Sequence, residues 1–157
     1  MIEIVFEDPR WTTVGLSELA EAAAEVTLPE GTWDVAVLAC DDARIAELNA
    51  EFRGKPQATN VLSWPSETRA ADNDGGMPSP PKDPELGDIA IAYDTCVREA
   101  EEQGKHLPHH VTHLFVHGLL HLLGYDHERD ADATLMERLE TDILGQLGIK
   151  DPYSDGK

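Results

Sequence analysis

The chain contains few of the features that mark disulfide-rich, secreted or membrane proteins. Its 157 residues include two cysteines, Cys40 and Cys96, which are far apart and form no C-x-x-C motif. We expect two buried free thiols, and a disulfide between them has less support. No apolar run is long enough to cross a membrane, and the acidic start MIEIVFEDPR lacks the basic-then-apolar form of a signal peptide. A cytoplasmic protein that makes no membrane contact is therefore expected.

Basic residues are also scarce. Twelve lysines and arginines face 31 aspartates and glutamates, which gives a formal net charge of −19. A solvated acidic surface favours solubility and predicts weak non-specific affinity for nucleic acids. It still allows a local basic groove around Arg53 and Lys55, and it leaves room for a protein partner to supply further affinity.

One short segment, HGLLHLLGYDH, holds three histidines in a spacing that suits a metal ion. His117 and His121 are four residues apart, so on a helix they point the same way. Gly124 can end that helix, because glycine tolerates the left-handed conformation, and the chain can then return His127 as a third ligand. Three protein ligands leave the fourth tetrahedral position to water, as in catalytic zinc sites. The alternative is that these histidines are hydrogen-bonded core residues.

The same spacing occurs in the metzincin proteases, H-E-x-x-H-x-x-G-x-x-H. In this chain Gly118 stands where those enzymes carry their general-base glutamate. This substitution argues against ordinary peptide hydrolysis. On the same helix, His109 and His113 continue the four-residue spacing of His117 and His121. Either could approach the substrate cleft; the alternative is that they are polar residues of the first turns. Asp126 could orient an imidazole or simply belong to a turn.

The pattern of elements predicts one α+β domain over residues 1–149, with a tail at 150–157. The order is β-α-β-α-β-β-α-α-α, which suggests a four-stranded mixed sheet covered by helices. Residues 65–85 are rich in proline and polar residues and predict a mobile loop, either a tolerated insertion or a flap over the site. The expected elements are strands at 2–6, 33–40, 58–64 and 86–93, and helices at 14–25, from Asp41 or Asp42 to 49, from Asp94 or Thr95 to 103, from Pro108 through the histidines, and at 131–147.

Three further segments accompany the histidine segment. They are Leu48-Asn49 followed by Phe52-Arg53-Gly54, the stretch ATNVLSWP at 58–65, and Leu86-Gly87-Asp88-Ile89. Together the four segments resemble the YbeY family of bacterial ribosomal RNA maturation factors. The histidine segment is the most specific of them, and the order of all four makes chance similarity implausible. Two positions depart from the family pattern, where Asn60 replaces an aspartate and Trp64 a phenylalanine.

The resemblance extends from about Met1 to Leu147 and implies a fold with the metal helix at its centre. It also implies a zinc-dependent, single-strand-specific endoribonuclease, one Zn²⁺ ion, and a role in maturation of the 3′ end of small-subunit ribosomal RNA and in ribosome quality control. The implied partners are single-stranded or ribosomal RNA, the small ribosomal subunit and its assembly factors. The implied catalytic residues are Arg53, His117, His121 and His127, with Arg53 and Lys55 as substrate-binding residues.

Two other functions remain open at this point. One is a metallopeptidase, which the metzincin spacing supports and Gly118 opposes. The other is a non-catalytic ribosome-assembly module whose metal is structural. The metal's fourth ligand separates the second from an enzyme, because a protein side chain would close the site whereas water would leave it reactive.

Overall fold

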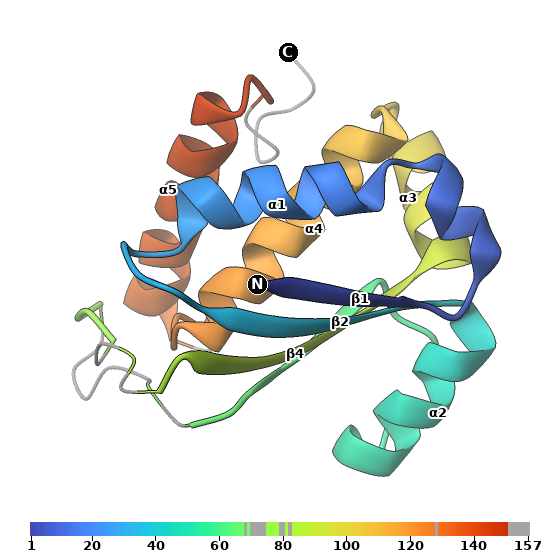
Figure 1. The fold of residues 1–157 in the computed structure, drawn as a ribbon, viewed down its shortest axis with the longest axis horizontal. Helices are drawn as coiled ribbons and strands as arrows, with labels where there is room; N and C mark the ends of the chain where they lie inside the picture. The colour runs from blue at the N-terminus through green and yellow to red at the C-terminus, as the bar shows by residue number, and fades with distance from the viewer. Residues whose placement is uncertain (68, 70–74, 79–80, 82, 128, 151–157) are drawn as a thin grey trace.

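The computed structural model describes residues 1–67, 69, 75–78, 81, 83–127 and 129–150 (Figure 1). In these ranges four strands, five α-helices and one short 3-10 helix follow one another along the chain. They are β1 (Ile2–Phe6), η1 (Pro9–Thr13), α1 (Leu16–Thr27), β2 (Asp34–Cys40), α2 (Asp42–Arg53), β3 (Val61–Pro65), β4 (Glu85–Ala92), α3 (Tyr93–Gln103), α4 (Leu107–Leu122) and α5 (Asp130–Gln146).

The four strands form one mixed sheet in the order β1-β2-β4-β3. Strands β1, β2 and β4 are parallel, and β3 pairs antiparallel with β4 at one edge. Helices α1, α3, α4 and α5 lie over one face of the sheet, whereas α2 lies on the other side (Figure 1). This arrangement confirms the α+β class and the four-stranded mixed sheet.

Helix α4 lies at the centre of the helical layer. It contacts α1, α3 and α5, and beneath it strands β3 and β4. Its side chains Phe115, Leu119 and Leu122 are fully buried in the main core. Pro108 occupies its first turn, where the missing N–H is not needed. The histidine-bearing helix is therefore positioned by core packing on several sides.

Most predicted elements agree with the structure to within a few residues. Helix α2 continues four residues beyond its expected end, until Gly54 adopts the left-handed conformation. Its N-terminus is capped by Asp41, whose side chain accepts from the backbone N–H of Arg44 at 2.8 Å. Helix α3 begins at Tyr93, so neither Asp94 nor Thr95 is its cap.

Both cysteines are free and buried, as expected. Burial raises the pKa of Cys40 to about 12, so its thiol remains protonated at neutral pH. In the described ranges, no helix combines the length and the apolar character needed to span a bilayer. Much of the predicted 65–85 loop, and residues 151–157 of the predicted tail, lie outside the described residues.

Gly87 allows β3 and β4 to approach closely beside the site. Its φ is +140°, and a Cβ atom there would lie 2.2 Å from the carbonyl oxygen of Trp64. Gly87→Ala should therefore destabilise the protein by about 2–5 kcal/mol, from backbone strain and steric overlap. Gly145→Ala is the control, because it lies in α5 with open space around it and should gain roughly 0.5 kcal/mol. Urea unfolding of both variants measures this, and equal stability of the two would contradict the prediction.

Candidate metal centre

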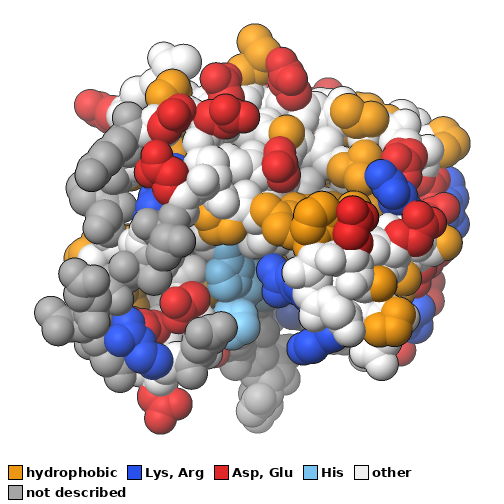
Figure 2. All heavy atoms as spheres, turned by 90° about the horizontal axis from the view of Figure 1, so that it is seen from below, with side chains coloured by type: hydrophobic (Ala, Val, Ile, Leu, Met, Phe, Trp, Pro, Cys, Tyr) orange, Lys and Arg blue, Asp and Glu red, His pale blue; other side chains and the backbone are white. Residues whose placement is uncertain are grey.

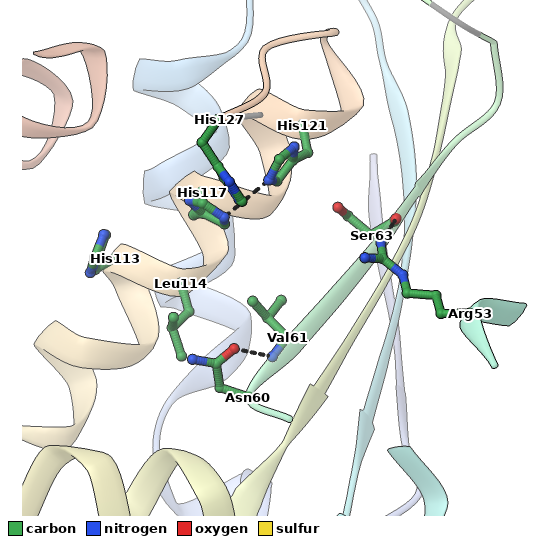
Figure 3. Close-up of a pocket in the computed structure, with 9 residues that line it drawn as sticks. All are labelled: Arg53, Asn60, Val61, Ser63, His113, Leu114, His117, His121 and His127. Carbon is green, nitrogen blue, oxygen red and sulfur yellow. Dashed lines mark hydrogen bonds between the residues drawn. The ribbon is translucent and has the colours of Figure 1, made fainter. Parts of the chain in front are cut away.

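Helix α4 presents two of the three predicted ligands side by side (Figure 3). The rings of His117 and His121 meet edge to face with their centroids 4.5 Å apart, and their Nε2 atoms lie 3.0 Å apart. Two nitrogens on one tetrahedral zinc ion lie about 3.3 Å apart, given Zn–N bonds of about 2.0–2.1 Å. The helical spacing alone thus brings these two imidazoles almost to ligand distance.

The third histidine arrives from the segment after α4. Gly124 has a φ of +108°, and a Cβ atom there would lie 2.6 Å from the carbonyl oxygen of Arg69, so only glycine fits this turn. Beyond it, the ring of His127 stacks on that of His117 at 5.5 Å. One nitrogen from each of the three histidines lies within 4.8 Å of the others, and in the described part of the chain no other cluster of His, Cys, Asp or Glu could hold a metal.

A buried glutamate from α5 is hydrogen-bonded to this cluster on the side away from the three facing nitrogens. Glu140 is 1% exposed, and its Oε1 atom accepts from His117 Nδ1 at 3.2 Å and from His113 Nε2 at 2.8 Å. When Nδ1 of His117 donates to this carboxylate, its Nε2 atom is left without a proton and faces the other two histidines. This donor set fits a metal ion.

The protonation states of His121 and Glu140 also suit metal binding. Burial, together with the nearby His117 and His127, lowers the pKa of His121 to about 4. Burial acts to raise the pKa of Glu140, but the hydrogen bonds from His113 and His117 outweigh it and lower that pKa to about 2. At neutral pH the centre therefore has a neutral imidazole at His121 and an ionised carboxylate behind His117, which are the forms that ligate and orient.

The histidines form one wall of an open pocket of about 320 Å³. The opposite wall is the edge strand β3, where Arg53 reaches across from α2 and its Nη2 donates to the carbonyl oxygen of Ser63 at 3.3 Å (Figure 3). Asn60 also lines the pocket. Its amide donates to Glu99 at 3.0 Å, and its oxygen accepts from the N–H of Val61. An ionised aspartate at position 60 could not donate to Glu99.

The remaining candidate residues differ in whether they line the pocket. His113 lines the pocket, whereas His109 is exposed and contacts the ring of His106. Lys55 is exposed and is not among the residues that line the pocket. A Cβ atom on Gly118 would lie 3.1 Å from Ile89 Cδ1, so a side chain at this position would point into the sheet.

Two residues that support the site were not among the predicted site residues. Glu140 could have been recognised from the sequence, because it falls between Met136 and Ile143 on the buried stripe of α5, where a carboxylate needs a partner. No sequence pattern points to Arg69. Its buried guanidinium donates to the carbonyl oxygen of Leu122 at 2.7 Å and so holds the C-terminal end of α4.

The fold and the site together define a single-domain α+β protein with an open three-histidine centre, as in metal-dependent hydrolases. The family model described as Endoribonuclease YbeY matches residues 6–148, and the chain belongs to this family.

Curated relatives and one solved structure resemble the chain over nearly its whole length. An Endoribonuclease YbeY of Ruegeria pomeroyi is 58% identical and covers 98% of each chain. That of Ruegeria sp. strain TM1040 is 56% identical and covers 98% of this chain and 96% of its own. A solution structure from Thermotoga maritima, at 24% identity, superimposes with a TM-score of 0.58 over 98% of this chain and 99% of its own. The last comparison concerns the fold alone.

Replacing the buried carboxylate should weaken metal binding. Glu140→Gln leaves an amide that cannot accept from His113 and His117 as a charged group, so zinc affinity should fall about 10- to 100-fold. Competition with a chromophoric chelator measures this affinity without reference to activity. Glu137→Gln is the matched control, because Glu137 lies on the exposed face of the same helix. Unchanged affinity in Glu140→Gln would show that the carboxylate does not orient the ligand.

Proposed function

We propose that the protein is a zinc-dependent, single-strand-specific endoribonuclease. It would act in the cytoplasm on ribosomal RNA, at the 3′ end of the small-subunit RNA, and in ribosome quality control. Its partners would be the small ribosomal subunit and its assembly factors. The family membership supports the ribonuclease class, and the finer assignments extend the resemblance set out from the sequence.

The observation that carries this proposal is the pairing of three histidines with an arginine across one open pocket. His117, His121 and His127 would hold the metal, and Arg53 lies on the facing wall. A zinc ion bound there would polarise a phosphoryl oxygen or lower the pKa of a bound water. A phosphodiester would suit this pocket by charge, because Arg53 and the bound zinc ion would both attract its negative charge.

Arg53 would bind the scissile phosphate and stabilise the charge that develops on its oxygens. Its guanidinium donates to the backbone carbonyl of Ser63, and within the described ranges no carboxylate pairs with it. Its charge therefore remains available to an anion. Lys55, two residues along the chain, would add a more distant phosphate contact.

The surface charge around the pocket is consistent with an anionic substrate. Figure 2 shows the histidines at the base of a hollow, with lysine and arginine side chains directly to one side of them. Acidic side chains occupy much of the surrounding face. Attraction to RNA would thus be confined to the pocket and its basic side, as a local groove in an acidic protein requires.

The two alternative functions have less support. For a peptidase, a glutamate at position 118 would point toward Ile89 and not into the pocket, so the general base has no equivalent place. For a structural metal, a fourth protein ligand would be needed, and the described residues offer three. The first observation disfavours a peptidase, and the second disfavours a closed structural site.

Loss of one ligand should abolish cleavage. We expect His121→Ala to cleave a labelled single-stranded RNA at least 100-fold more slowly than the wild type. Wild-type activity should disappear with a chelator and return with zinc. His109→Ala is the matched control, because it is an exposed histidine on the same helix outside the pocket. Equal cleavage by all three preparations would indicate a contaminating ribonuclease and would refute the assignment.

Arg53 should matter to the reaction and not to the metal. Arg53→Gln should lower kcat/KM for single-stranded RNA by about 10²- to 10³-fold, because one charged donor to the phosphate is lost. Zinc content, measured by atomic emission, should stay at the wild-type level. Arg138→Gln is the control, since Arg138 is an exposed arginine on α5. A fall in zinc content would place Arg53 in the metal centre instead.

A further inference from the structure

Phe52 is a large aromatic side chain near the C-terminal end of α2 that is left open to solvent. It is 59% exposed, although it continues the stripe of α2 on which Ile45 and Asn49 are buried. It lies next in sequence to Arg53, whose side chain lines the pocket. Leaving a ring of this size in water forgoes the free energy of burial, so its position calls for an explanation.

A second aromatic residue holds the ring of Phe52 in place. Phe52 meets Trp64 edge to face, with centroids 5.5 Å apart and an interplanar angle of 65°. Trp64 follows Ser63 on the edge strand β3, so their side chains point to opposite faces of the sheet. Ser63 faces the pocket. The aromatic pair therefore lies just across the edge strand from the histidines.

The surroundings of Phe52 suit a nucleic acid strand better than a protein surface. Its exposed chain neighbours Glu51, Arg53 and Lys55 are charged, so charged side chains flank the ring along the chain. Within the described ranges, neither Arg53 nor Lys55 pairs with a carboxylate. One aromatic face flanked by cations is the combination that binds single-stranded RNA, with bases stacked on the ring and phosphates on the cations.

We propose that Phe52, supported by Trp64, is a stacking subsite for one unpaired base of the RNA strand whose phosphate Arg53 binds. This inference rests on the proposed function and deepens it. A base held in a duplex cannot stack on a side chain, so the subsite would select single-stranded RNA. It would also supply affinity that is insensitive to the acidic surface, because stacking does not depend on net charge.

The test is binding of a fluorescently labelled oligouridine of about twelve nucleotides, followed by anisotropy. Every protein is full-length and carries His121→Ala, so that the strand is not cleaved during the measurement. Phe52→Ala, Phe52→Leu and Phe52→Tyr are compared in this background. Val5→Ala is the matched control, because Val5 is an apolar side chain of similar exposure, 63%, on β1. A second set of strands carries one abasic residue at each position in turn.

Phe52→Ala and Phe52→Leu should bind about 5- to 150-fold more weakly, the loss that follows from removing one stacked base. Phe52→Tyr and Val5→Ala should bind as the parent does. One abasic position should weaken binding to the parent and have no further effect on Phe52→Ala. If Phe52→Ala binds as the parent does, or if leucine restores binding as well as tyrosine, the stacking subsite is wrong and the proposed function stands. If no protein binds the strand, the stacking subsite is overturned, and the proposed function is decided separately by cleavage with the wild type and His121→Ala.

Discussion

The burial of α4 is the constraint on which the rest of the site depends. This helix contacts three helices and two strands, and its apolar residues fill the main core. The strip that is left open toward the edge of the sheet carries His113, His117 and His121. Imidazole nitrogens at the border of a core need polar partners, and here they have each other and a carboxylate from α5. The packing that buries the helix therefore also orients its ligands.

Close backbone approach completes the same arrangement. Gly118 lets α4 rest against Ile89 of β4, and Gly124 lets the following turn pass Arg69. Larger residues at either place would separate α4 from the sheet or from the segment after β3. Across the pocket, Arg53 donates to the carbonyl oxygen of Ser63 in the edge strand. Gly118 and Gly124 thus permit the close packing of α4 and of the turn that follows it.

The part of the site that the sequence predicts is the part formed by residues close together in the chain. Two histidines four residues apart, followed by a glycine and a third histidine, specify a cluster from spacing alone, and the strand and helix patterns gave the fold class. The partners of those histidines could not be found in this way. Glu140 is 23 residues from His117 in the chain, and Arg69 is 53 residues from Leu122. Such contacts follow from how helices dock on a sheet. A charged residue within an apolar stripe, such as Glu140, predicts that it has a buried partner. The sequence pattern does not identify that partner.

A net charge of −19 is compatible with an anionic substrate because electrostatic repulsion acts only over a short distance in salt solution. At physiological salt, charges separated by more than about 8 Å are largely screened, so the acidic surface acts mainly on whatever touches it directly. Inside the pocket the charged group is Arg53, and a divalent cation held by the three histidines would add to its attraction for a phosphate. The acidic exterior would then repel RNA that lies across the surface, as a duplex must. On the stacking proposal, a single strand would present one phosphate to the pocket and one base to Phe52 while the rest stays in solvent. On this argument the acidity contributes to selectivity, since it penalises every mode of RNA contact except entry at the site.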